Sequence, residues 1–211
     1  MWTPKGAWQD GCRLASAGLL ALYVFKESQP PRHREKRPLI QVLQSERLRL
    51  TPRVLADLPA NLEMDLDAEV MRYVGGPIED ASAHEAYLRS RITAAFPPGL
   101  GCWSLRERRE SAPFLGWVVL APHELVPGEI EIGWRLRRES WGRGFATEAA
   151  RRLLDHGFDE LGLEEIVADI HPENLASIRV AEKIGLRRHE DREVYEGPSA
   201  YFKARRESSS R

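Results

Sequence analysis

Residues 131–149 read EIGWRLRRESWGRGFATEA, and this stretch carries the strongest structural signal in the chain. Its first half continues an alternating pattern over residues 129–137, which predicts a half-buried strand. Its second half is a glycine-rich turn that runs directly into a helical pattern, with apolar residues at three- and four-residue steps as far as Leu161. No Ser, Thr, Asp or Asn stands where this helix needs an N-cap. We therefore expect a helix whose first N–H groups have no internal partner.

The open start of that helix indicates an anion site. N–H groups at a helix N-terminus carry partial positive charge and bind phosphate or pyrophosphate readily. Gly142 and Gly144 would let a ligand approach the backbone closely. The motif G-x-x-x-x-G-K-[ST] is absent, and Thr147 stands where a dinucleotide fingerprint has its third glycine. For a G-x-G pair taken alone, a tight turn that binds nothing is the alternative.

The following segment supplies a second motif. Residues 165–170 (EIVADI) predict a strand, which His171-Pro172 ends. Residues 174–184 (NLASIRVAEKI) predict a short helix that stops at Gly185. Asn174 is the expected N-cap of this helix, and Ser177 lies one turn into it.

Helices and strands are mixed in the segment before residue 129. The patterns predict strands at 46–51, 101–107 and 113–120, and helices at 53–74 (interrupted at Pro59) and 80–96. The charged residues 108–111 make a hairpin turn between two of the strands. This order predicts one α/β (α+β) domain with an antiparallel meander in its middle.

Together these motifs resemble the GNAT superfamily of acyl-CoA-dependent N-acetyltransferases. The resemblance rests on W-G-x-G-x-A-T-E-A at 141–149 combined with N-x-x-S-x-x-x-x-x-x-x-G at 174–185. E-R-L-R-L at 46–50 and D-A-E-V-M-R-Y at 67–73 resemble more closely the branch that contains the ribosomal-protein-alanine N-acetyltransferases. The similar region runs from about residue 43 to about residue 205.

The resemblance implies the GNAT fold and acetyl-CoA as co-substrate. That fold is a single mixed, mostly antiparallel sheet of roughly six to seven strands with a parallel splayed pair, flanked by about four helices. The strands at 129–137 and 165–170 would be the splayed pair, with the pantetheine arm between them. The pyrophosphate would lie on the turn at 141–146, where the family's usual Gln or Arg is replaced by Trp141. Because the family binds pyrophosphate through backbone groups, this departure leaves the expected site intact.

The cofactor residues implied by the resemblance belong to these motifs. They are Trp134, Arg135, Leu136, Gly142, Arg143, Gly144, Ala146, Thr147 and Asn174. Arg143 would add positive charge at the pyrophosphate. Backbone N–H groups near Trp134 to Leu136, where the family strand is bulged, would bind the oxyanion.

The chemistry of amide formation needs a base and a partner for the departing thiolate. Glu131 is our first candidate for the base and Glu129 the second, since alternation places both on one face of the strand. The alternative for either is a salt-bridged strand glutamate. Many family members carry a tyrosine seven residues after the motif's asparagine, but here that position is Ala181. Ser177 then supplies the hydroxyl that could donate a hydrogen bond to the thiolate. The alternative is that Ser177 only bonds the backbone of its own helix.

Other aromatic and histidine residues give weaker signals. We expect Trp103, Trp117, Trp134 and Trp141 in the core, with an acceptor pocket as the alternative. Tyr195, before the last hairpin, is a candidate for a residue over the acceptor site. His123, in the loop before the strand at 129–137, is expected at the surface.

Composition excludes several classes of protein. The 211 residues contain 31 Lys or Arg and 32 Asp or Glu, so a strongly basic nucleic-acid domain is excluded. Two cysteines, Cys12 and Cys102, cannot make a disulfide framework, and they favour a reducing, cytoplasmic location. There is no C-x-x-C or H-E-x-x-H and the six histidines are scattered, so we expect no metal site.

The first 38 residues form a basic and apolar extension with a linker in our interpretation. The acetyltransferase domain would span residues 39–205, and residues 206–211 would be a tail. The apolar run at 14–25 is shorter than the roughly 20 residues of a membrane-spanning helix, and a poor cleavage region follows it. An amphipathic segment, a membrane or nucleic-acid tether, and translated sequence upstream of the true start are the alternatives.

The resemblance implies acetyl transfer to a primary amine by direct attack within a ternary complex. The acceptor would be a protein N-terminus, an amino acid, a polyamine or a drug. Residues 1–40 carry an excess of basic side chains, so the rest of the chain is acidic, which favours a cationic acceptor. A catalytically degenerate acetyl-CoA-binding sensor, which needs only the loop, is the alternative. We expect no nucleic-acid or membrane partner, and a homodimer is common in this branch.

Overall fold

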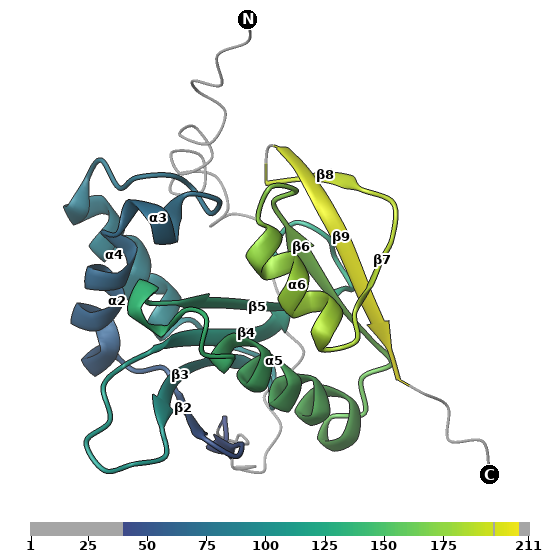
Figure 1. Ribbon diagram of the computed structural model, residues 1–211, viewed down its shortest axis with the longest axis horizontal. Coiled ribbons are helices and arrows are strands. Elements are labelled where there is room, and N and C mark those ends of the chain that lie inside the picture. The colour runs from purple at the N-terminus through teal and green to yellow at the C-terminus, as the bar shows by residue number, and fades with distance from the viewer. Residues whose placement is uncertain (1–39, 196, 207–211) are drawn as a thin grey trace, which may run out of the picture.

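A computed structural model describes residues 40–195 and 197–206 of the protein (Figure 1). The expected extension at 1–38 lies outside the described residues, as do residues 207–211 of the expected tail. Within the described ranges, no helix is both long enough and apolar enough to cross a membrane.

A nine-stranded mixed sheet is the centre of the described structure. The order of neighbouring strands is β1-β2-β3-β4-β5-β6-β9-β7, and β8 pairs with β9. The pair β5–β6 is parallel and every other pair is antiparallel. The strands are β1 (Leu43–Gln44), β2 (Leu48–Pro52), β3 (Gly101–Glu107), β4 (Gly116–Pro122), β5 (Ile130–Leu136), β6 (Glu165–Ile170), β7 (Arg187–Arg188), β8 (Arg192–Val194) and β9 (Gly197–Arg205).

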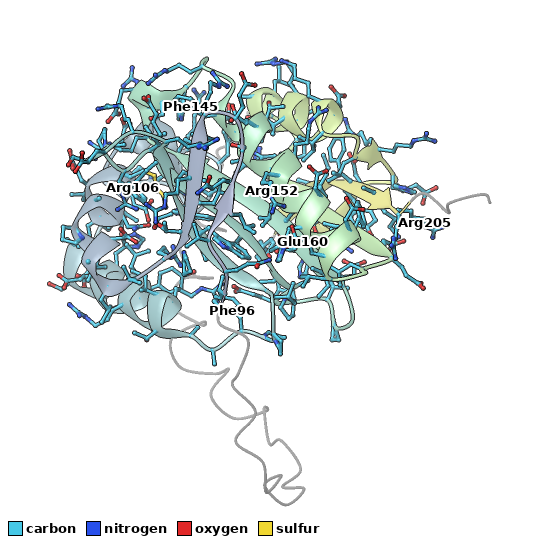
Figure 2. All side chains as sticks on the ribbon, turned by 90° about the horizontal axis from the view of Figure 1, so that it is seen from below. Phe96, Arg106, Phe145, Arg152, Glu160 and Arg205 are labelled. Carbon is cyan, nitrogen blue, oxygen red and sulfur yellow. The ribbon has the colours of Figure 1, made fainter. Side chains whose placement is uncertain are left out.

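Five α-helices flank the sheet in the described ranges. They are α2 (Leu58–Asp65), α3 (Ala68–Met71), α4 (Ala81–Thr93), α5 (Phe145–Asp155) and α6 (Leu175–Lys183), with 3-10 turns η1 (Leu55–Asp57) and η2 (Arg138–Ser140) and a π turn η3 (His156–Glu160). In Figure 2, Arg106 lies on the side of the sheet that carries the first helices, whereas Arg152 and Glu160 lie on the side of α5.

Alternation along the strands divides the apolar residues between the two faces of the sheet. Val118 and Leu120 of β4 are fully buried in the main core, which α5 and α6 cover. Trp117 points to the other face and packs in a smaller cluster with Met64 of α2. Helix α5 fits the larger core because its apolar residues repeat at helical spacing and bury one stripe, namely Ala149, Ala150, Leu153 and Leu154.

The predicted fold class is confirmed, and the element counts need correction. The strands β1 and β7 have two residues each, too few to show an alternating pattern, and the described sheet has nine strands where the resemblance implied six to seven. The helical pattern at 53–74 is divided between α2 and α3, because Asp67 caps the N–H of Glu69 and starts a new helix.

Candidate active site

Strands β5 and β6 part directly after Glu131. Their parallel pairing consists of one register position, Glu131 opposite Val167, whereas β4 pairs with all seven residues of β5. Beyond that position β6 and β9 follow a clearly different direction from β4 and β5 (Figure 1). The parallel, splayed pair expected from the resemblance is therefore present.

The backbone of β5 turns two N–H groups into this splay. The N–H of Arg137 donates to the carbonyl of Leu115 on the β4 side, at 2.9 Å. Because hydrogen-bonding partners alternate along an antiparallel pair, the N–H groups of Trp134 and Leu136 point away from β4. They lie beyond the last residue of β5 that pairs with β6, and are available to a ligand.

One expectation for β5 needs correction, and the side chain of Arg135 can be placed. The strand has no bulge, since it pairs residue for residue with β4 from Ile130 to Leu136. Arg135 does not face the splay: its guanidinium donates to Asp65 of α2 at 2.9 Å and lies over the ring of Trp117. Alternation places its side chain on the same face as Glu131, opposite α5, so any contact of Arg135 with the cofactor would have to come from its backbone.

The glycine-rich turn has the conformation that its sequence requires. Gly142 has φ 72° and Gly144 has φ 79°, in the left-handed region that side chains with a Cβ adopt only at a cost. Gly144 is the N-cap of α5 and, as predicted, no side chain caps the helix. The first N–H to bond within the helix is that of Glu148, to the carbonyl of Gly144 at 3.0 Å. The preceding N–H groups, from Phe145 to Thr147, form the expected anion-binding end.

A carboxylate on the first turn of α5 fastens the turn to the β1–β2 hairpin. Glu148 accepts hydrogen bonds from the Ser45 hydroxyl at 2.7 Å, the Arg47 backbone N–H at 2.7 Å and Arg47 Nε at 2.6 Å. Partial burial disfavours its charge, but these donors outweigh that cost and lower the pKa of Glu148. Arg47 Nη1 also donates to the carbonyl of Arg143 at 3.1 Å, so the hairpin holds the turn at two points.

The side chains of the turn itself make contacts outside the splay. Trp141 donates its indole N–H to the carbonyl of Leu136 at 2.9 Å, which fixes the turn to the end of β5. Arg143 pairs with Glu107 at 2.8 Å and lies over the ring of Phe145. Its charge is therefore shared with a carboxylate in this structure. Arg143 and Phe145 border a pocket of about 310 Å³, which is also lined by Arg47, Glu107, Arg108 and Arg109.

Helix α6 brings a hydroxyl to the other side of the splay. Asn174 caps this helix as predicted, accepting from the N–H of Ser177 at 3.1 Å. The indole N–H of Trp134 on β5 donates to Ser177 Oγ at 3.3 Å. Since the serine oxygen acts as acceptor in this contact, its own proton is free to be donated elsewhere.

The two candidate bases have different environments. Glu131 accepts one hydrogen bond, from the Tyr195 hydroxyl at 3.0 Å, and desolvation of its carboxylate raises the pKa to about 7. Glu129 accepts both arms of the Arg192 guanidinium, at 3.1 and 2.8 Å, and the Tyr201 hydroxyl at 3.0 Å. Partial burial opposes its charge, but these donors prevail and lower the pKa of Glu129. A base working near neutral pH needs a pKa near 7, which favours Glu131.

The prediction that His123 lies at the surface is wrong. Its side chain is 0% exposed, and Nε2 lies 3.0 Å from Oδ2 of Asp169, which is also 0% exposed. Nδ1 accepts the backbone N–H groups of Leu125 and Val126, at 3.0 and 3.1 Å. Because Nδ1 is an acceptor, we assign the ring proton to Nε2, which donates to Asp169.

Sequence reasoning missed three members of this group, namely His123, Asp169 and Arg192. Arg192 donates to both Asp169 and Glu129, and it joins β8 to β6 and to the start of β5. One signal was present: Asp169 is an acidic residue among the apolar residues that follow Glu165 in this strand, where a buried partner is expected. Ligand atoms of His123, Glu131 and Asp169 lie within 4.8 Å of one another, a spacing that a metal ion could span. However, His123 and Arg192 already donate to the oxygens of Asp169.

The tryptophans divide between core and site. Trp103 is fully buried in the main core, as expected, and Trp117 packs on the opposite face. Trp134 contacts Ser177 across the splay, and Trp141 is half-exposed at the turn. Two of the four therefore border the candidate site.

Comparison with known proteins agrees with this geometry. Residues 47–187 match the acetyltransferase (GNAT) domain. The chain is 32% identical over 153 residues to the FsC-acetyl coenzyme A-N(2)-transacetylase of Aspergillus fumigatus, covering 68% of this chain and 64% of that protein.

Solved structures share the fold. A GNAT-family acetyltransferase from Bacillus anthracis is 26% identical, with a TM-score of 0.66 over 78% of this chain and 98% of that one. The spermidine N-acetyltransferase of Vibrio cholerae, solved with CoA and spermine, is 18% identical, with a TM-score of 0.60 over 75% of this chain and 95% of that one. Since the family match spans more than half of the chain and includes β5, the glycine-rich turn and α6, the protein belongs to the GNAT family of acetyltransferases.

Proposed function

We propose that the protein is an acetyl-CoA-dependent N-acetyltransferase that transfers an acetyl group to a primary amine within a ternary complex. One observation carries this proposal: Glu131, a carboxylate whose pKa is about 7, lies at the point where β5 and β6 part. A base with this pKa is matched to removing a proton from an amine near neutral pH.

The residues present fit acetyl-CoA. Gly142 has nothing within 4 Å of the position where a Cβ would be, so a phosphate can approach the turn closely. The uncapped first turn of α5, with Gly144, Ala146 and Thr147, offers N–H groups to the pyrophosphate. The β5 backbone at Trp134 and Leu136 lies open to the pantetheine arm. The neighbour from Vibrio cholerae holds CoA, which supports the proposal at the level of the fold.

Each group of the chain then has a defined task, with acetyl-CoA supplying the acetyl group as a thioester. Glu131 takes the proton of the amine, directly or through water, as the C–N bond forms and the C–S bond breaks. The N–H groups of Trp134 and Leu136 stabilise negative charge on the carbonyl oxygen. Ser177 donates its free proton in a hydrogen bond to the departing thiolate. No step in this scheme needs a metal.

The acceptor class is a finer proposal. The Aspergillus relative is named for N(2) acetylation, and the Vibrio neighbour binds spermine. These two names, together with the excess of acidic over basic side chains in the domain, favour a cationic small molecule or peptide with a primary amine as the acceptor. We also propose that the protein belongs to the ribosomal-protein-alanine-like branch, because its E-R-L-R-L and D-A-E-V-M-R-Y segments resemble that branch. We further propose a cytoplasmic location and a homodimer.

An amine screen tests the proposed function against the sensor alternative. Acetyl-CoA binding is measured by isothermal titration, and release of free thiol is followed with peptides, amino acids, polyamines and aminoglycosides. We expect that acetyl-CoA binds and that at least one amine causes release of free thiol. The rate of this release should be the same with and without EDTA. Binding without transfer to any amine would establish the sensor and overturn the proposal. A rate abolished by EDTA and restored by a metal would refute the metal-free scheme.

A further inference from the structure

We propose that Tyr195 and His123 are positioning residues for Glu131. The hydroxyl of Tyr195 holds the carboxylate, and the ring of His123, anchored by Asp169, holds the ring of Tyr195. This inference rests on the proposed role of Glu131 as the base. It adds two residues, from a loop and a turn far apart in the sequence, that act on the reaction through Glu131.

The backbone of Tyr195 is the first argument. Its φ is 51°, a conformation that is costly for a bulky aromatic residue. Ser111, at φ 52°, shares this conformation, but it is a small, exposed residue in the β3–β4 turn. Strain of this kind persists where the surrounding structure fixes the residue, and it concentrates at functional sites. Two contacts fix the side chain of Tyr195, namely the hydrogen bond of its hydroxyl to Glu131 and the contact of its ring with His123.

The fixation of His123 is the second argument. Its ring stacks on that of Tyr195, with centroids 5.6 Å apart and planes 21° apart. Both ring nitrogens are engaged, Nδ1 by two backbone N–H groups and Nε2 by Asp169. Asp169 is in turn held by Arg192, which also holds Glu129. The imidazole therefore has no freedom to turn and presents a fixed face to the tyrosine.

The charges around Glu131 are the third argument. The groups that face it are Tyr195 from the β8–β9 turn, His123 and Glu124 from the β4–β5 loop, and Asp169 from β6, with Arg192 and Glu129 behind Asp169. Desolvation is the main cause of the raised pKa of Glu131, and the acids Asp169 and Glu124 add to it. Positive charge on His123 and the hydrogen bond from Tyr195 act in the opposite direction and stabilise the carboxylate. Loss of that hydroxyl should therefore raise the pKa of Glu131 further.

The test is the pH dependence of kcat/KM for the best amine of the screen. Tyr195→Phe keeps the ring and removes the hydroxyl. We expect the acidic limb of its profile to lie about 0.5–1 pH unit above that of the wild type, the size expected from one ordinary hydrogen bond. The Kd for acetyl-CoA should be unchanged, which also shows that the variant folds. The ionisation of the amine cancels because every variant is measured with the same acceptor.

A matched pair tests the role of the histidine ring. His123→Phe and His123→Ala both remove the bond to Asp169, but only the first keeps an aromatic face against Tyr195. Both substitutions also remove the charge of His123, which lowers the pKa of Glu131, so the difference between the two variants reports on the ring. We expect the acidic limb of His123→Ala to lie above that of His123→Phe. If Tyr195→Phe fails to bind acetyl-CoA, this pair alone decides.

Two results separate failure of this inference from failure of the proposed base. The positioning role would be overturned if the acidic limb of the pH profile of Tyr195→Phe coincided with that of the wild type. It would also be overturned if the acidic limbs of the two His123 variants coincided with each other. Glu131→Gln is measured in parallel. If it keeps both the rate and the limb, Glu131 is not the base, and the proposed mechanism fails together with the inference built on it.

Discussion

The two ends of the splay between β5 and β6 are built in different ways. At the α5 end, the expected ligand contacts are backbone N–H groups on an exposed turn, held by the partly exposed side chains of Arg47 and Glu148. At the Glu131 end, the groups are side chains, and His123 and Asp169 among them are completely buried. One end is suited to holding an anion and the other to moving a proton.

This difference follows from the chemistry of the two tasks. A phosphate needs several weakly positive donors at the right spacing, which any backbone with the right dihedral angles supplies. A base needs one carboxylate whose pKa is displaced, and displacement requires desolvation and chosen neighbours. Substitutions at the α5 end should therefore change affinity modestly, whereas substitutions at the Glu131 end should change rate and pH dependence.

The largest effect is expected for Glu131→Gln. Loss of a general base typically costs a factor of about 10²–10⁴ in rate. We expect kcat/KM for the amine to fall within this range while the Kd for acetyl-CoA stays within about twofold of the wild type. Thiol-release kinetics and titration measure the two quantities. Glu193→Gln removes an exposed carboxylate of β8 and is the matched control. If the affinity of Glu131→Gln for acetyl-CoA fell by as large a factor as its kcat/KM, the contrast between the two ends of the splay would be wrong.

The same substitution should change the pH dependence of stability. The pKa of Glu131 is about 7 in the folded protein, against an ordinary value of 4.5, so folding favours the protonated acid. That contribution is complete below pH 4.5 and is lost as the pH rises through 7. Relative to Glu131→Gln, the wild type should therefore lose up to about 3 kcal/mol of unfolding free energy between pH 4.5 and 8. Urea denaturation at both pH values tests this, and a constant difference would contradict it.

Gly144→Ala should weaken the cofactor end. The left-handed backbone at this position costs a residue with a Cβ about 1–2 kcal/mol, and the turn can relieve that cost by leaving the binding conformation. We expect the Kd for acetyl-CoA to rise by about fivefold to tenfold, with turnover at saturation unchanged. Gly185→Ala is the control, because Gly185 also has a positive φ but lies after α6. A Cβ at Gly185 would have nothing within 4 Å, whereas one at Gly144 would lie 3.4 Å from Arg47 Nη2. Similar Kd changes in both variants would mean that the effect is not local.

Ser177→Ala is expected to have a smaller effect, on rate alone. Loss of one hydrogen bond to the thiolate should reduce turnover by about twofold to tenfold, with the Kd for acetyl-CoA little changed. Ser90→Ala is the control, because that serine bonds the backbone of its own helix. Unchanged turnover in Ser177→Ala would remove this hydroxyl from the mechanism.

The smallest effect is expected for Arg47→Met. An exposed ion pair contributes at most about 1 kcal/mol, so we expect the Kd for acetyl-CoA to rise by about twofold to fivefold. Arg47→Lys should not restore affinity, because lysine lacks the fork that reaches both Glu148 and the carbonyl of Arg143. Arg89→Met breaks an exposed pair on α4 and should leave the Kd unchanged. A full recovery with lysine would show that charge alone suffices.

Local features were predictable because neighbouring residues cause them. The glycines at 142 and 144, the missing cap on α5 and the Asn174 cap each depend on a few adjacent positions, and all are present. The expected bulge came from family likeness, and it is absent because β5 pairs with β4 without interruption. The strands β1, β7 and β8 are too short to leave a pattern in the sequence.

The environment of Glu131 could not be predicted in the same way. Its hydrogen-bond partner, Tyr195, is 64 positions away in the chain, and His123 is separated from Asp169 by 46. Glu129 and Glu131 are equivalent by alternation, yet Arg192 neutralises one and leaves the other desolvated. From the residues alone, His123 could be read only as a surface histidine in a loop.

Backbone conformation, capping and helix periodicity are therefore written in the sequence of this protein, because they depend on short-range sterics and hydrogen bonds. The motifs at 141–149 and 174–185 also carry the resemblance to the GNAT family, which led us to expect the anion-binding turn and to consider Glu131 as a candidate base. The tertiary structure decides which carboxylate has a pKa near 7 and which residues contact it, because β6, β8 and the β4–β5 loop meet beside β5. Desolvation and charge act through space, so these properties exist only once the chain has folded.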